Sequence, residues 1–133
     1  MVGVKGTKGN LVQVEIHGIG EVMRQLQHAN KQILQGADMG VVRAGTFIQE
    51  EVKESIIGNR PERKSVDTGK FANSINFKKT KKAEGKVETN VSYAKHLEYG
   101  TSRIEPRRHF MNTKARNQGK IKEIIEKEIK RAI

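Results

Sequence analysis

Residues 74–91 read SINFKKTKKAEGKVETNV, and this stretch decides the predicted fold. Apolar and polar residues alternate in each half, and a period of two is typical of a half-buried strand. The residues between the halves, 82–85, include a glycine, so the two strands are predicted to pair as a β-hairpin. The side chains that we expect to face the core are Ile75, Phe77, Val87 and Val91.

A short strand and two amphipathic helices are predicted before the hairpin. Residues 11–16 alternate between apolar and polar side chains, which predicts the strand. Apolar residues at helical spacing predict a first helix over about 20–35 that ends at Gly36. The second helix is predicted to begin with Asp38 as its cap and to end at Gly58. Small residues on its apolar face, which permit close packing, are Gly40, Ala44 and Gly45.

Helical patterns also follow the hairpin. Residues 92–99 predict a short helical turn that ends at Gly100. A last helix is predicted over about 111–132, and residues 117–119 are a place where it could divide. The order of these elements predicts an α+β fold. It consists of two amino-terminal helices, an antiparallel β-sheet with a central hairpin, and a carboxy-terminal helix.

Two segments are predicted to lack regular structure. Residues 1–10 are rich in glycine and lysine, and predict a flexible tail ahead of a single domain over residues 11–133. Residues 59–67 are polar and contain Pro61. Because this connection is longer than usual, we interpret it as a mobile or interaction loop.

The net positive charge of the chain lies entirely in residues 60–133. The 133 residues include 26 Lys and Arg against 15 Asp and Glu, a formal charge of +11. Residues 1–59 sum to zero, so residues 60–133 carry the whole excess. Such asymmetry indicates a surface that meets a polyanion or an acidic protein. With 35% hydrophobic and 5% aromatic residues, the core is predicted to be thin and to gain burial in an assembly.

The sequence offers little for catalysis or cofactor binding. The absence of cysteine excludes disulfides, a thiolate nucleophile and cysteine-ligated metals. No metal-ligand spacing joins the four histidines, and no phosphate-binding loop or nucleophile motif is present. We therefore expect neither an enzyme nor a cofactor. No apolar run approaches the length of a membrane span or a signal sequence, so a soluble protein without membrane contact is expected.

Two basic clusters are candidates for contact with a polyanion or a protein partner. One is at the hairpin tip and the other is in the segment before the last helix: Lys78, Lys79, Lys81, Lys82, Arg103, Arg107 and Arg108. Lysine neutralises phosphate, and arginine also binds carboxylates and phosphates in bidentate fashion. A small basic protein that binds nucleic acid nonspecifically is therefore an alternative function. Sequence-specific binding is not expected, because no recognition helix or set of stacking aromatic residues accompanies the clusters.

Three short motifs in a fixed order connect the chain to a known family. They are VDTGKFANSI at residues 66–75, YAKHLEYGT at 93–101 and PRRHFM at 106–111, with the hairpin between the first and second. This order resembles the phage neck or minor tail-component family, the gene-product-ten type proteins of long-tailed phages. The resemblance covers about residues 11–132. The chain departs from the family pattern at two places. The proline-rich segment that usually precedes the first motif is reduced to Pro61, and the polar pair Arg108-His109 replaces more apolar residues before Phe110.

The resemblance implies a structural virion protein without catalytic activity. Proteins of this kind lie in the neck and assemble as rings around the DNA channel, and a hexamer fits the symmetry of a tail. The implied partners are the head connector or stopper and the tail terminator or tail tube, with DNA passing through the channel. The implied location is the virion, after synthesis in the cytoplasm of the bacterial host.

The resemblance also implies roles for the residues of the first two motifs. Thr68 and Gly69 would form a turn that launches the first hairpin strand, with Gly69 at positive φ. Tyr93 and Tyr99 would anchor the short helical turn on the sheet. Glu98 would bond a backbone donor or an arginine of a neighbouring subunit.

The last positions carried over from the family concern the path into the final helix. Gly100 and Thr101 would end the short helical turn. Pro106 and Phe110 would fix the direction in which the last helix begins.

Overall fold

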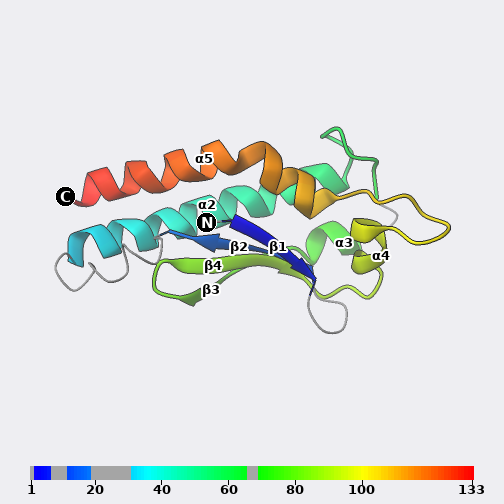
Figure 1. Ribbon diagram of the computed structural model, residues 1–133, viewed down its shortest axis with the longest axis horizontal. Coiled ribbons are helices and arrows are strands. Elements are labelled where there is room, and N and C mark those ends of the chain that lie inside the picture. Colours follow the sequence, from blue (N-terminus) through cyan, green and yellow to red (C-terminus); the bar gives the residue numbers. More distant parts are fainter. Residues whose placement is uncertain (1, 7–11, 19–30, 66–68) are drawn as a thin grey trace.

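The computed structural model describes residues 2–6, 12–18, 31–65 and 69–133. Figure 1 shows two long helices lying over one face of an antiparallel sheet, with two short helices at one end. The elements in chain order are β1 (Val2–Gly6), β2 (Val12–His17), α2 (Lys31–Ile56), α3 (Lys70–Asn73), β3 (Asn76–Lys81), β4 (Glu84–Thr89), α4 (Ala94–Tyr99) and α5 (His109–Ala132). The predicted α+β class is confirmed.

The sheet has four antiparallel strands in the order β1-β2-β4-β3. The strand predicted over residues 11–16 is confirmed as β2, which pairs with β4 from Val12 opposite Thr89 onward. Residues 2–6, which were assigned to a flexible tail, instead form β1 along β2. Val2 and Val4 favour a strand whereas the glycines and the lysine do not, and pairing with β2 supplies the hydrogen bonds that complete it.

The predicted hairpin is confirmed as β3 and β4, with Phe77 opposite Val87. Its turn is shorter than predicted, because β4 begins at Glu84 and only two residues lie between the strands. Ala83, at the turn, has a φ of 59° and its amide donates to Asp38 Oδ1 at 2.9 Å. Ile75, Val87 and Val91 are buried, and Phe77 is partly buried against the core.

Helix α2 runs without interruption through the predicted boundary between two helices. The end at Gly36 and the cap at Asp38 are therefore wrong, and residues 20–30 of the predicted first helix lie outside the described residues. Gly36 remains helical because it packs against α5: a Cβ there would lie 2.6 Å from Ile129 Cα. Asp38 binds Lys79 and the hairpin turn instead of a helix terminus.

Helix α5 also continues through residues 117–119, where a division was predicted. The Asn117 amide donates back to the Thr113 carbonyl at 2.9 Å, so its polar group is satisfied within the helix. Helices α2 and α5 run antiparallel across the sheet (Figure 1). The small residues of α2 permit the predicted close packing, since a Cβ at Gly40 would lie 2.7 Å from Ile125 Cα.

Candidate assembly site

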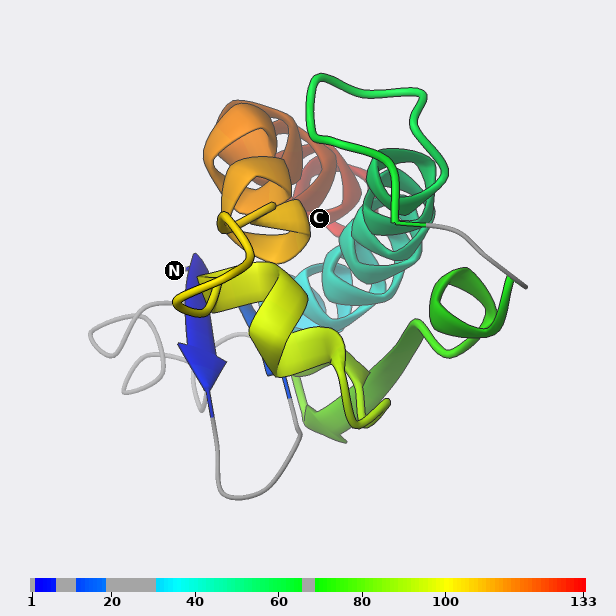
Figure 2. The same cartoon turned by 90° about the vertical axis from the view of Figure 1, so that its right-hand side faces the viewer.

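The three sequence motifs meet at one end of the molecule. Helices α3 and α4 and the first turn of α5 lie together there, on the far side from the β3–β4 turn (Figure 1). Figure 2 looks onto this end and shows α4 in front of the start of α5. We refer to it as the motif end, formed by residues 57–65, 69–75 and 91–113.

Glu98 lies at the centre of the motif end. Its side chain is buried, and its two carboxylate oxygens accept hydrogen bonds from the amides of Phe110 at 2.9 Å and Met111 at 2.8 Å. Burial raises the pKa of Glu98, although the two amide donors act in the opposite direction. Of the two roles expected for Glu98, the structure shows the first: its carboxylate accepts from backbone donors. Glu98, in α4, thereby caps the start of α5.

The residues after Glu98 form a compact exposed loop. Gly100 has a φ of 77°, and a Cβ there would lie 2.8 Å from the ring of Pro106. Thr101 Oγ1 accepts hydrogen bonds of 3.1 Å from the amides of Arg103 and Ile104. Gly100 therefore ends α4, and the loop that follows holds its own shape.

The remaining motif residues are distributed around α3 and α4. Gly69 has the predicted positive φ, 83°, but it precedes α3 and does not launch β3 directly. Thr68 lies outside the described residues. Tyr93 packs edge-on against Phe71 with ring centroids 5.7 Å apart, and Tyr93 and Tyr99 are 39% and 38% exposed. The described geometry thus gives Tyr93 a packing contact with an aromatic ring and leaves much of both tyrosines at the surface.

A buried hydrogen-bond chain, absent from the sequence prediction, connects α2, loop 57–65 and α5. His109 is fully buried, with Nδ1 2.7 Å from Ser55 Oγ and Nε2 2.7 Å from Ser65 Oγ. Ser55 donates to Glu62 Oε1 at 2.6 Å, and Arg107 Nη1 donates to Ser65 Oγ at 2.7 Å. We call these five residues the histidine network.

The donors in the histidine network can be assigned. Burial lowers the pKa of His109 to about 4, so the imidazole is neutral at pH 7. Because Ser55 uses its single hydrogen on Glu62, its oxygen must accept from His109 Nδ1–H. Nε2 then has no hydrogen and accepts from the Ser65 hydroxyl. Every member of the chain thus has a partner, as buried polar groups require.

Glu62 ends this network as a carboxylate. Burial alone would raise its pKa, but hydrogen bonds from Arg116, Ser55 and Asn112 outweigh burial and lower the pKa to about 2. The guanidinium of Arg116 binds both carboxylate oxygens, at 2.9 and 3.0 Å. The network therefore fastens the loop that was interpreted as a mobile or interaction loop onto both long helices. From the sequence, Arg107 was named only as a basic residue and His109 only as a departure from the family, and Ser55 is a polar residue on the buried face of α2.

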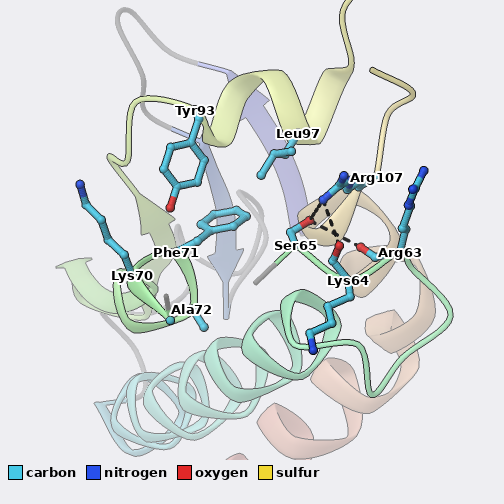
Figure 3. Close-up of a pocket in the computed structure, with 10 residues that line it drawn as sticks. Arg63, Lys64, Ser65, Lys70, Phe71, Ala72, Tyr93, Leu97 and Arg107 are labelled. Atoms are coloured by element: carbon cyan, nitrogen blue, oxygen red, sulfur yellow. Dashed lines mark hydrogen bonds between the residues drawn. The ribbon is translucent and has the colours of Figure 1, made fainter. Parts of the chain in front are cut away.

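A basic pocket opens beside the histidine network (Figure 3). Its volume is about 550 Å³. Its described lining residues are Arg63, Lys64, Ser65, Gly69, Lys70, Phe71, Ala72, Tyr93, Leu97 and Arg107. The guanidinium of Arg107 reaches across to the Lys64 carbonyl at 3.0 Å and to Ser65. The pocket thus combines cationic edges with aromatic and aliphatic walls.

The hairpin-tip lysines do not join this site. The β3–β4 turn lies at the end of the sheet opposite α4 (Figure 1). Each of the four has a carboxylate partner: Lys78 with Glu88, Lys79 and Lys82 with Asp38, and Lys81 with Glu84. The two predicted basic clusters are therefore separate surfaces, and the hairpin cluster is paired within the chain.

The arginine cluster, in contrast, belongs to the motif end. Among the described residues, Arg103, Arg107 and Arg108 form no ion pair with a carboxylate, and the same holds for Arg63 and Lys64. Arg108 has a φ of 54° at the start of α5. Three of these five cations, Arg63, Lys64 and Arg107, line the basic pocket, and the other two lie in the segment before α5.

Comparison with known families gives one match. The family model described as "Bacteriophage HK97-gp10, putative tail-component" matches residues 20–100, more than half of the chain. The chain belongs to this family. The matched range contains the first motif and the second as far as Gly100, Glu98 included, and ends before Thr101, Pro106 and Phe110. No curated protein and no solved structure matches the chain.

Membership of the phage tail-component family confirms the resemblance and makes the chain a structural virion protein of a tail-completion type. This family is structural and not an enzyme family. Within the described ranges, no cluster of three or more acidic or histidine side chains is arranged to hold a metal ion. Among the described helices, none combines the length and apolar character that crossing a bilayer requires.

Proposed function

We propose that this tail-component protein completes the junction between phage head and tail by assembling as a ring around the DNA channel. Its partners are the head connector or stopper on one side and the tail terminator or tail tube on the other. Six copies suit the symmetry of a tail, and a ring of identical chains uses head-to-tail interfaces. The protein is made in the cytoplasm of the bacterial host and is incorporated into the virion.

The observation that carries this proposal is the family match over residues 20–100. The geometry of the motif end supports it. Glu98, Gly100 and Phe110 are occupied in fixing the start of α5 and the exposed loop before it. These residues stabilise the surface of the motif end. The cations without ion pairs at this end would bind an acidic partner.

The alternative function, nonspecific binding of nucleic acid, has less support. The hairpin lysines are already engaged with Asp38, Glu84 and Glu88, so phosphate would have to displace these carboxylates. Retention on DNA at increasing salt separates the two functions. A ring protein should bind DNA weakly as a monomer, whereas a DNA-binding protein should bind tightly and lose affinity steeply with salt.

Negative-stain images and mass photometry of the purified chain test ring formation. Closed rings of uniform size, whose abundance rises with protein concentration, are expected. A strictly monomeric species at all accessible concentrations would contradict the ring, and tight salt-sensitive DNA retention by that monomer would favour the alternative.

A further inference from the structure

We propose that the exposed loop at residues 101–105 of one copy inserts into the basic pocket of the next copy, which forms the repeating contact of the ring. This inference rests on the proposed function, because it names the partner of the motif end as a second copy of the chain. We call residues 101–105 the knob.

The knob has the chemistry that the pocket requires. All its residues are exposed, and it presents an apolar side chain, Ile104, between a cation, Arg103, and a carboxylate, Glu105. The proposed contact places Ile104 and Glu105 in the pocket and leaves Arg103 outside it. Ile104 is 38% exposed, and Glu105 forms no ion pair with any described residue. A carboxylate without a partner beside an exposed aliphatic group is a suitable ligand for a pocket with cationic edges and apolar walls.

The pocket has matching groups available. The guanidinium of Arg107 uses Nη1 for both of its described hydrogen bonds, so Nε and Nη2 are left to bind a carboxylate. Arg63 adds positive charge at the edge, and Leu97 and Tyr93 provide apolar walls. Lys64 turns its carbonyl toward Arg107, and its side chain runs along Gly58 (Figure 3). A volume of about 550 Å³ falls in the range of sites that enclose small groups.

The knob is already ordered before any contact. Thr101 holds the loop through its side-chain oxygen, and its amide donates to the Ile104 carbonyl at 2.8 Å. Little conformational entropy would therefore be lost on insertion.

The positions of knob and pocket suit a head-to-tail contact. The knob and α3, which forms one wall of the pocket, lie on opposite sides of α4 (Figure 2). Each chain thus offers one knob and one pocket as distinct surfaces of the motif end, with Arg107 of the pocket two residues after the knob. A contact between unlike surfaces closes into a ring when the rotation between copies is constant.

Cysteine cross-linking tests this contact in a chain that has no native cysteine. The double variant Glu105→Cys with Lys64→Cys, treated with a short bis-maleimide, should give a ladder of covalent oligomers on a denaturing gel. The ladder should end at the copy number of the ring. The matched control, Glu105→Cys with Lys122→Cys, places the second cysteine on the exposed face of α5 and should remain almost entirely monomeric.

Charge reversal gives an independent readout in the same full-length protein. Glu105→Arg and Arg63→Glu should each raise the concentration needed for half-assembly by about tenfold, and the combined variant should recover most of that loss. Lys122→Glu should leave assembly unchanged. Recovery in the combined variant identifies a direct contact, which a folding defect would not produce.

The outcomes separate this inference from the proposed function. Rings that form without a ladder from the 105/64 pair, or with an equal ladder from the control pair, overturn the knob-and-pocket contact alone. A chain that never assembles overturns both the contact and the ring. In the Lys64→Cys variant, protection of the new thiol from maleimide by a short DNA oligonucleotide, without oligomers, would make the pocket a phosphate site and would overturn the contact.

Discussion

The Oε1 atom of Glu98, at the end of α4, accepts a hydrogen bond of 2.9 Å from the backbone amide of Phe110 in the first turn of α5. No side chain within α5 caps its start, where Arg108 has a left-handed backbone conformation. Glu98 therefore supplies the acceptors that the first amides of α5 need. It also links the second motif, residues 93–101, to the orientation of α5.

Removing this cap should destabilise the fold. Glu98→Ala leaves two amides without acceptors in a buried place, and should lower the free energy of unfolding by about 2–3 kcal/mol. Urea denaturation followed by circular dichroism measures the change. Glu123→Ala, on the exposed face of α5, is the control and should alter stability by less than about 0.5 kcal/mol. Equal stabilities for both variants would mean that Glu98 does not cap α5.

Stability should decrease in mild acid because of His109. Its pKa is lowered by burial from 6.5 to about 4 in the folded chain, so the unfolded chain binds more protons between these values. The contribution of His109 to the free energy of unfolding is therefore complete above pH 6.5. It is lost as the pH falls toward 4, by roughly 3 kcal/mol in total. Glu62, whose folded pKa is about 2, adds a further loss only below about pH 4.5.

Urea unfolding at a series of pH values measures this dependence. His109→Gln is the comparison, because glutamine does not titrate. The difference in unfolding free energy between the wild type and this variant should shrink as the pH falls from 6.5 to 4. A constant difference across this range would show that His109 does not have a lowered pKa.

Two glycine substitutions on the long helices should have opposite effects. Gly36→Ala puts a Cβ 2.6 Å from the Ile129 backbone, so α2 and α5 must separate at a cost of about 1–3 kcal/mol. Gly119→Ala meets no atom within 4 Å, and should stabilise α5 by about 0.5–1 kcal/mol through helix propensity alone. Thermal denaturation of both variants measures the change in stability. A gain in stability for Gly36→Ala would contradict the close contact between α2 and α5.

Neutralising the hairpin tip should not prevent assembly. A variant with Lys78, Lys79, Lys81 and Lys82 all changed to Gln loses its ion pairs with Asp38, Glu84 and Glu88, but these exposed pairs each contribute less than about 1 kcal/mol. Ring formation and head–tail joining are expected to persist, while any weak DNA retention falls. Loss of joining in this folded variant would assign the hairpin tip to the assembly surface.

Local patterns were enough to predict the elements with strong periodicity. The hairpin, β2 and the two long amphipathic segments follow from side-chain alternation that a single stretch of chain contains. The errors occur where tertiary contacts override local preference. Gly36 is a typical helix end, yet packing against Ile129 keeps it helical, and β1 exists because β2 offers it a partner.

The site was predicted only in part for a similar reason. The motif residues Glu98, Gly100 and Phe110 were singled out because the motifs that contain them resemble those of a known family. Ser55 and His109 are 54 residues apart, and no spacing rule connects them. Likewise, the pairing of Lys79 with Asp38 across 41 residues was invisible, so the hairpin tip was predicted to be an open basic surface.

The central claim, that this chain joins phage heads to tails, is tested most directly by electron microscopy of particles made without it. The account predicts separate DNA-filled heads and free tails, which join when the purified wild-type chain is added to the lysate. Complete, infectious virions formed in the absence of the chain would contradict it.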